Sequence, residues 1–490
     1  MKKMPNLNIF SQVSLQKGAA VITYNLMNSG SDSLYAYLCK SIKRDILHGT
    51  LKPGERLPSK RTFASNLGVS VVTVENAYAQ LIAEGYIYSI PKRGFYVADF
   101  SNLTAQPQKE TPAFSEEKIP LTGGDSSYFA DFSSNQTSSD LFPFTIWSKV
   151  IREILNDSRV QLMTNSPCGG IFALRESIAR YLKDFRGMSV RPEQIVIGAG
   201  TEYLYGLLIQ LLGNDNMYAV ENPGYRKPER IYNSYHVPCA RISMDEAGVQ
   251  VPELERAGAD IVHITPSHQY PTGIVMPISR RYELLAWASR KEGRYIIEDD
   301  YDSELRLSGQ PIPTLYSIDM SGKVIYMNTF TKTLCSTVRI SYMILPQPLL
   351  KPFYENLSFY SCTVSNFEQY TLARFIEEGK FESHVNRLRS HYRKKRDMFL
   401  EALHSSRLQD MAVISGSEAG FHFLLTLRTD VPQETVIARA RSKSIKLVPL
   451  SAYYYGDAPE HVQNIYVMNF SSLEVSRAEE ICKRLYACCG

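Results

Sequence analysis

Three side chains with complementary chemistry follow two apolar runs in the second half of the chain. Lys332 ends the T-F-T-K motif 329–332, which follows the apolar run 324–327, and Asp299 and Tyr301 follow the apolar run 295–297. If both runs are strands, alternation at the strand end sends Asp299 and Tyr301 toward the same crevice. Open α/β sheets bind ligands at the carboxyl ends of their strands. We therefore expect an amine, a carboxylate and a phenol to meet at one site.

This set meets the demands of pyridoxal phosphate, which needs an amine for a Schiff base, a carboxylate for its pyridinium nitrogen and donors for its phenolate oxygen and phosphate. Gly200 and Thr201 open an expected helix, whose N-terminal amides favour an anion. Thr329 adds a hydroxyl and Arg339 a bidentate guanidinium. Tyr225, in the run E-N-P-G-Y, is placed to stack on the ring. The sequence thus predicts a pyridoxal phosphate site.

Each of these signals is weak when it stands alone. A lysine after a strand is most often an ordinary surface residue, and the acidic run 298–300 could simply begin a helix. The coenzyme site is favoured only by the combination of residues, in this order and at these spacings.

The elements that must position the site alternate along the chain. Short apolar runs separated by helical stretches predict an α/β fold with a mostly parallel sheet and helices on each side. A long helical stretch, 367–404, then leads into a smaller terminal region with strands at 421–427 and 465–470. The expected strands of the large sheet are 194–197, 217–220, 261–264, 295–297, 324–327 and 340–345.

The first hundred residues follow a different pattern. Helices are expected at 33–47, 59–67 and 70–85, before two β-prone segments at 86–90 and 95–97, which is the order of a winged helix-turn-helix. Residues 1–99 hold 12 Lys and Arg against 6 Asp and Glu, so they carry +6 and the remainder carries −2. A basic module suits double-stranded DNA, although charge alone also fits a solvated surface.

DNA contacts are expected from the third helix, from the start of the second helix and from the tip of the hairpin. A recognition helix reads bases with polar side chains near its N-terminal end, while basic residues hold phosphate or enter a groove. The alternative is a degenerate helix-turn-helix used only for protein contacts. The candidate residues are Ser70, Thr73, Glu75 and Asn76 on the third helix, Lys60 and Arg61 on the second, and Lys92 and Arg93 at the tip.

Motifs in this segment resemble those of the GntR family of winged-helix regulators. They are P-S-K-R at Pro58, L-G-V-S at Leu67, T-V-x-x-A-Y at Thr73, E-G-Y-I at Glu84 and R-G-F-Y-V at Arg93. The resemblance implies an Arg directly after Ser70, where this chain has Val71. One phosphate or base contact is therefore missing, and the operator sequence cannot be borrowed from the family.

From about residue 130 the chain resembles the fold-type I aminotransferases, and over nearly its whole length it resembles the MocR-type subfamily of GntR regulators. The resemblance implies that Lys332 forms the Schiff base, Asp299 holds the pyridinium and Tyr301 bonds the phenolate oxygen. It also implies that the phosphate is held by Thr201, Thr329 and Arg339. The motifs that carry it are T-P-S-H-Q-Y-P-T-G at Thr265, S-R-R-Y-E-L-L at Ser279, I-I-E-D-D-Y-D-S-E at Ile296 and V-I-Y-M-N-T-F-T-K at Val324.

Departures from the subfamily bear on the effector. Tyr270 replaces the Asn of the aminotransferase N-P-T-G loop, and Gln269 is a candidate for the missing donor to the coenzyme. Amino-acid-responsive relatives dock a carboxylate on two arginines, and the corresponding positions here are Lys227 and Gln463. A Gln cannot replace a bidentate fork. Either the effector has no α-carboxylate docked in this way, or another group such as Arg226 substitutes.

We expect the coenzyme itself to be the signal, as in the PdxR-like branch of the subfamily, which controls vitamin B6 synthesis. An amino-acid sensor is the first alternative. A second is a working aminotransferase, in which Lys332 would also move a proton, although loss of the docking arginine argues against efficient turnover. A third is a coenzyme-free scaffold in which the site residues are relics.

Three parts are expected along the chain: a winged helix-turn-helix module at 1–99 with its core at 33–98, a flexible linker at 100–127 and an effector domain at 128–490. Eight cysteines without metal or disulfide spacing predict a reducing compartment and no metal site. No run of 18 apolar residues and no signal peptide are found, so we expect a cytoplasmic protein away from membranes. The resemblance implies a homodimer with domain-swapped protomers.

Overall fold

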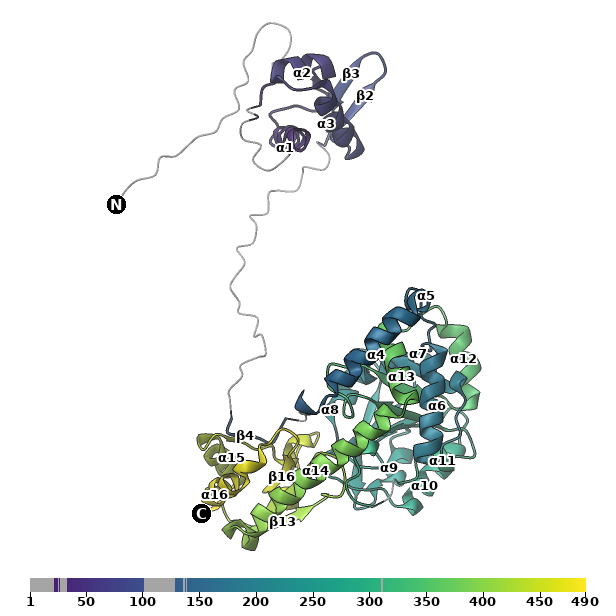
Figure 1. Ribbon diagram of the computed structural model, residues 1–490, viewed down its shortest axis with the longest axis vertical. Coiled ribbons are helices and arrows are strands. Elements are labelled where there is room, and N and C mark those ends of the chain that lie inside the picture. The colour runs from purple at the N-terminus through teal and green to yellow at the C-terminus, as the bar shows by residue number, and fades with distance from the viewer. Residues whose placement is uncertain are drawn as a thin grey trace, which may run out of the picture. The chain divides into compact units, whose positions relative to one another are not determined.

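The computed structural model describes residues 22–24, 26, 33–100, 128–134, 137, 139–309 and 312–490. The chain divides into two compact units, residues 1–124 and 125–490 (Figure 1). The expected linker lies outside the described residues except for Phe100. Within the described part of the chain, no helix combines the length and the apolar character that crossing a membrane requires.

The N-terminal unit packs three helices against a small antiparallel sheet with the strand order β1-β3-β2. Its buried centre is formed by Phe63, Tyr78 and Leu81, none of which is exposed to solvent. The elements are α1 (Leu34–Leu47), β1 (Arg56–Leu57), α2 (Lys60–Leu67), α3 (Val71–Ala83), β2 (Ile87–Ile90) and β3 (Gly94–Val97). The expected helices and hairpin are therefore present, and β1 is an addition.

Local side-chain chemistry sets the ends of the two central helices. The hydroxyl of Ser59 accepts a hydrogen bond from the backbone N–H of Thr62 at 3.2 Å, and that of Ser70 accepts one from Thr73 at 3.1 Å. Both are N-cap bonds, which satisfy amides that the first turn leaves unpaired. Gly68 ends α2 with φ +66°, a left-handed conformation that glycine adopts without steric cost. The turn between α2 and α3 is thus specified by residues within it.

The C-terminal unit is built on an eight-stranded sheet with the order β5-β12-β11-β10-β9-β6-β7-β8. Most neighbouring pairs are parallel, as expected. The strands are β5 (Ile195–Gly198), β6 (Tyr218–Asn222), β7 (Cys239–Asp245), β8 (Gly248–Val249), β9 (Ile261–Ile264), β10 (Tyr295–Asp299), β11 (Val324–Thr329) and β12 (Ser341–Ile344).

Helices cover both faces of this sheet (Figure 1). Successive side chains of a strand point to opposite faces of the sheet. Val196 therefore packs against the helices of a first layer, and Ile195 against those of a second layer on the other face. The first layer contains α7 (Thr201–Leu212), α8 (Arg226–Ser234) and α12 (Gln347–Leu357). The second contains α4 (Phe144–Asp157), α6 (Phe172–Arg186), α9 (Val251–Arg256), α10 (Ile278–Ser289), α11 (Leu315–Ile318) and α13 (Asn366–Glu377). The short α5 (Arg159–Leu162) follows α4.

Two features differ from the sequence-based expectation. Strand β12 runs antiparallel to β11 and β5, because the short connection 330–340 contains no crossover helix of the kind that parallel neighbours require. The helical stretch expected at 367–404 is present, but it is not one continuous helix. It is divided into α13 and α14 (Lys380–His404) at Gly379, which has φ +68° and cannot continue a right-handed helix.

A smaller C-terminal layer is formed by an antiparallel sheet of β13 (Ala412–Ser415), β14 (His422–Leu427) and β16 (Ile465–Asn469) in the order β13-β14-β16. A parallel pair joins β4 (Ala130–Asp131) to β15 (Ile445–Lys446), so the start of the unit is tied to its end. Helices α15 (Gln433–Ser442) and α16 (Ala478–Cys489), with the second half of α14, share one apolar cluster with these strands.

Candidate functional site

A cavity of about 410 Å³ lies at the carboxyl ends of the central strands of the large sheet. Two of its lining residues, Asp299 and Thr329, are the last residues of β10 and β11, and Thr201 is the first residue of α7. Its other lining side chains that bear on chemistry are Glu202, Tyr205, Lys227, Tyr225, His263, Tyr270, Tyr301, Thr331, Lys332 and Arg339. The sequence-predicted lysine, carboxylate, phenol and arginine are therefore brought together.

Lys332 lies in the loop that follows β11 and contributes to the cavity wall. Burial lowers the pKa of its amine to about 8, and the negative charge of Asp302 opposes that shift. An amine attacks a carbonyl only in its neutral form. The surroundings of Lys332 thus give it a substantial neutral fraction near pH 8, as a Schiff-base lysine requires.

The two carboxylate oxygens of Asp299 differ: Oδ2 has partners within the chain, and Oδ1 has no hydrogen-bond partner among the described residues. The hydroxyl of Tyr205 donates to Oδ2 at 2.7 Å, and Nε2 of His263 lies 3.5 Å from the same oxygen. Burial and the charge of Asp299 raise the pKa of Tyr205 well above its ordinary value, so its hydroxyl stays protonated and donates. Oδ1 is buried and has no hydrogen-bond partner among the described residues. A buried acceptor of this kind calls for a donor from outside the chain.

Tyr301 is held by the loop that follows β9. Its hydroxyl donates to the backbone oxygen of His268 at 3.2 Å, and the imidazole Nδ1 of His268 lies 2.7 Å from Oδ2 of Asp302. Burial and the charge of Asp302 raise the pKa of Tyr301 well above its ordinary value. The phenol is therefore a protonated donor with a fixed orientation at the edge of the cavity.

The remaining wall suits a phosphate group. Thr201 begins α7 at the end of the helix where backbone amides and the dipole favour an anion. Thr329 shares hydrogen bonds of 2.8 Å with the hydroxyls of Thr331 and Ser341. Gly200 is not among the lining residues, but a Cβ on it would lie 2.2 Å from a guanidinium nitrogen of Arg339. Glycine is thus needed here for the close approach of Arg339 to the backbone.

The residues present fit pyridoxal phosphate. Oδ1 of Asp299 can accept the pyridinium N–H, and Arg339 with the start of α7 can hold the phosphate. The single hydroxyl proton of Tyr301 can turn from the backbone oxygen of His268 to the phenolate oxygen. Tyr225 is 52% exposed and packs edge-on against Tyr270, with ring centroids 6.0 Å apart. It lines the cavity, as a stacking residue must, but a good part of its ring is open to solvent.

Gln269 does not lie in the cavity wall. It is buried, and its amide nitrogen donates to the backbone oxygens of Pro223 at 3.0 Å and Tyr270 at 2.9 Å. Its amide oxygen accepts from the backbone and hydroxyl of Thr272. Because these bonds occupy both ends of the amide, the structure gives no support to Gln269 as a donor to the coenzyme. Its contacts instead fix the loop that carries Tyr270.

Three residues at the site were not found by sequence reasoning. Tyr205 and His263 lie inside a helix and a strand, where each is easily taken for a core residue, and both reach the carboxylate of Asp299. Glu202 forms ion pairs with Lys227 and with Arg339, which lie 25 and 137 positions away. No local pattern predicts such distant partners.

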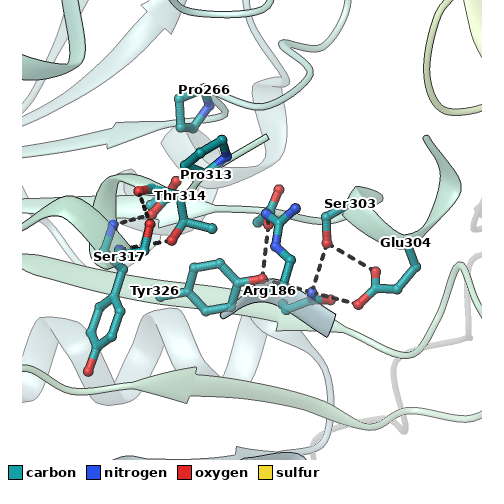
Figure 2. Close-up of polar contacts among 12 residues, drawn as sticks. Arg186, Pro266, Ser303, Glu304, Pro313, Thr314, Ser317 and Tyr326 are labelled. Atoms are coloured by element: carbon teal, nitrogen blue, oxygen red, sulfur yellow. Dashed lines mark hydrogen bonds and ion pairs between the residues drawn. The ribbon is translucent and has the colours of Figure 1, made fainter. Parts of the chain in front are cut away.

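A buried polar network lies next to the end of β10, and Figure 2 shows Arg186, Tyr326, Ser303 and Glu304 as part of it. Asp300 forms an ion pair with Arg186, and the hydroxyl of Tyr326 donates to the same carboxylate at 2.9 Å. Glu298 accepts from the backbone N–H groups of Leu315 at 2.8 Å and Tyr316 at 2.9 Å, at the start of α11. Alternation thus sends the two neighbours of Asp299 away from the cavity and into the protein interior.

The DNA-contact candidates lie on the N-terminal unit. Asn76, Arg61, Lys92 and Arg93 are exposed, and Lys92 adopts φ +64° at the hairpin tip. The other four candidates, Ser70, Thr73, Lys60 and Glu75, have partners within the chain. The hydroxyls of Ser70 and Thr73 lie 2.8 Å apart in the N-cap of α3, and the amine of Lys60 lies 2.6 Å from Glu75.

Two family models match the chain. The model described as bacterial regulatory proteins, gntR family, matches residues 34–97, and the one described as aminotransferase class I and II matches residues 129–475. Among solved structures, the kynurenine aminotransferase of Pyrococcus horikoshii, in a complex described with PMP, superposes with a TM-score of 0.63 at 26% identity. The superposition covers 74% of this chain and 91% of that enzyme.

Curated relatives match both units at once. The uncharacterized HTH-type transcriptional regulator YdeL of Bacillus subtilis is 36% identical over 93% of this chain and 96% of its own length. The probable rhizopine catabolism regulatory protein MocR of Rhizobium meliloti is 30% identical over 87% of this chain and 88% of its own. The pyridoxine biosynthesis transcriptional regulator PdxR of Corynebacterium glutamicum is 30% identical over 88% and 90%.

Proposed function

This chain belongs to the gntR family of bacterial transcriptional regulators, in the MocR-type branch that carries an aminotransferase class I and II domain, and we propose that its signal is pyridoxal phosphate bound beside Lys332. The coenzyme supplies an aldehyde that condenses with a lysine amine. The chain supplies the amine, the carboxylate partner of the ring and the cationic end of the cavity. Binding shifts the population of regulator conformations that hold operator DNA.

The observation that carries this proposal is the unpartnered oxygen of Asp299. A buried carboxylate oxygen without a donor is costly, by about 1–3 kcal/mol or more for a charged group, and a pyridinium N–H supplies the missing donor. Tyr205 orients the carboxylate from the other side at 2.7 Å. The same arrangement serves no purpose in a coenzyme-free scaffold, and it therefore argues against that alternative.

The charges of the cavity favour the coenzyme over an amino acid as the effector. Among the described residues that line it, Arg339 is the only guanidinium, and it lies at the start of α7, where the phosphate is expected. Lys227 shares Glu202 with Arg339, and as an ammonium it cannot form a bidentate fork. Gln463 is not in the cavity wall, and the exposed Arg226 donates to the backbone oxygen of Tyr454. An effector α-carboxylate therefore has no guanidinium fork of its own.

We further propose that a homodimer binds double-stranded DNA in the cytoplasm, with protomers that exchange their DNA modules. Two winged helices in one dimer recognise two half-sites, so the spacing of the half-sites depends on how the dimer is arranged. The relatives named regulators of pyridoxine biosynthesis and of rhizopine catabolism share both units with this chain. The likeness to PdxR supports vitamin B6 metabolism as the regulated process.

A titration of DNA affinity tests the proposal. The full-length protein first selects a DNA duplex from a random library. Its Kd for that duplex is then measured at increasing concentrations of pyridoxal phosphate, with and without a mixture of amino acids. The coenzyme alone should change the DNA Kd of the wild type and of Lys351→Ala, a control in which an exposed lysine is removed. The coenzyme should leave the DNA Kd of Lys332→Ala unchanged. A response that requires an amino acid would establish the amino-acid-sensor alternative instead.

The aminotransferase alternative is tested with the same proteins. Lys332 and Asp299 would serve turnover as well as sensing, so an assay of common amino donors with an oxo acid acceptor is needed. We expect at most a slow half-reaction, because among the described residues that line the cavity the one guanidinium, Arg339, is assigned to the phosphate and none is left for the substrate carboxylate. Sustained multiple turnover by a protein without DNA affinity would contradict a regulatory role.

A further inference from the structure

The carboxylate of Glu202 places a negative charge in the part of the cavity where the coenzyme phosphate is expected. Its Oε2 pairs with Arg339 and its Oε1 pairs with Lys227. The three side chains come from the first turn of α7, the first turn of α8 and the segment before β12. One carboxylate thus pairs with two of the three Lys and Arg side chains among the described residues that line the cavity. The third is Lys332, the amine expected to react with the aldehyde.

The approach of Glu202 and Arg339 to the backbone of Gly200 shows that this carboxylate lies at the helix end itself. A Cβ at Gly200 would lie 2.2 Å from Nη2 of Arg339 and 2.7 Å from Oε2 of Glu202. The N-terminal amides of α7, which attract negative charge, therefore already have a carboxylate beside them.

The carboxylate remains charged under all ordinary conditions. Burial raises the pKa of Glu202, but the hydrogen bond from Lys227 and the positive charge of Arg339 outweigh that effect, and its pKa is lowered overall. A dianionic phosphate that enters this end of the cavity therefore meets a like charge, and it must share or take over the guanidinium that Glu202 holds.

We propose that Glu202 is a built-in competitor of the coenzyme phosphate for Arg339 and thereby sets the affinity of the site. The phosphate gains Nη2 of Arg339 only if Glu202 gives up that pair and keeps Lys227. This competition weakens coenzyme binding relative to a site with a neutral side chain. A regulator that reports the free coenzyme concentration needs such weakening, because a saturated site reports nothing. The inference rests on the proposed function, since it concerns the same site.

The test is coenzyme affinity, followed by absorbance in titrations of the full-length protein. Glu202→Gln keeps the size of the side chain and removes its charge, which should tighten pyridoxal phosphate binding about tenfold, the factor that corresponds to roughly one charge-assisted hydrogen bond. Binding of pyridoxal, which lacks the phosphate, should change less than twofold. Glu255→Gln is the matched control, because Glu255 forms its ion pair with Arg294 away from the cavity.

Inorganic phosphate gives a second readout. Its inhibition constant against the coenzyme, corrected for the coenzyme affinity of each protein, should be about tenfold lower for Glu202→Gln than for the wild type. Equal or weaker coenzyme binding by Glu202→Gln would overturn the inference and would make Glu202 a residue that positions Arg339. If the wild type binds no pyridoxal phosphate, the proposed function itself fails. If Glu202→Gln does not fold, as judged by its thermal transition, Glu202→Ser is read in the same way.

Discussion

Asp299→Asn separates the binding role of this residue from a structural one. In the ligand-free protein, Oδ1 of Asp299 is buried without a donor, while Oδ2 accepts from Tyr205 at 2.7 Å. Removing the negative charge relieves the cost of the unpartnered oxygen, so the free energy of unfolding of the ligand-free protein should stay the same or rise. Coenzyme binding should weaken, because the ring N–H loses a charged acceptor.

The magnitude follows from the hydrogen bond that is lost. A bond to a charged group contributes about 1.5–3 kcal/mol, and about 1.4 kcal/mol corresponds to a tenfold change in Kd. We therefore expect the Kd for pyridoxal phosphate to rise between about 10-fold and 150-fold. Tyr205→Phe, which removes only the neutral donor to Asp299, should raise it about fivefold, in line with a bond of about 1 kcal/mol.

Absorbance titrations give the coenzyme Kd, and urea unfolding of the ligand-free proteins gives their stabilities. The reasoning is refuted if Asp299→Asn binds the coenzyme as the wild type does. It is also refuted if the substitution destabilises the ligand-free protein by several kcal/mol, because Asp299 would then be a structural carboxylate in the manner of its neighbour Asp300.

Three further perturbations test other parts of the structure. With the pKa of Lys332 at about 8, the rate of coenzyme capture in stopped-flow absorbance should rise with pH up to about 8 and then level off, and a flat profile from about pH 6.5 to 9 would contradict a reactive amine with this pKa. Replacing both Lys92 and Arg93 by Ala should weaken DNA binding and reduce the slope of log K against log salt by about 2; an unchanged slope would exclude the hairpin tip from the interface. Arg186→Met should lower the free energy of unfolding in urea by about 3–5 kcal/mol, since it leaves Asp300 buried without its cation, and Asp300→Asn in addition should restore part of the loss if the pair is the cause.

The sequence was sufficient to predict most of the large sheet. Runs buried on both faces, such as 261–264 and 324–327, can be recognised without the structure because almost every residue is apolar. Strand β7 escaped prediction because it lies near the sheet edge and its exposure is mixed along its length. The break at Gly379 was missed because the amphipathic pattern continues on both sides of it.

The candidate site was predictable where its residues follow strand ends. Lys332 and Asp299 are placed by the strands that precede them, so motif and topology agree. Tyr205 and Glu202 could not be predicted in the same way, because their importance arises from partners that only the fold brings near. Gln269 illustrates the opposite case: a polar residue in a suggestive motif whose hydrogen bonds all serve its own loop.

Helix α14 links the loop after β10 to the C-terminal layer. Arg389 and Arg393 donate to the backbone oxygens of Glu304 at 2.6 Å and Leu307 at 2.7 Å, and Arg396 donates to that of Ser417 at 3.0 Å. At about 1.5 Å per residue, this 25-residue helix is a rod of roughly 37 Å. A rearrangement of the loop that carries Tyr301 would therefore either break these bonds or move α14 with it, which makes this helix a mechanical link between the cavity and the C-terminal layer.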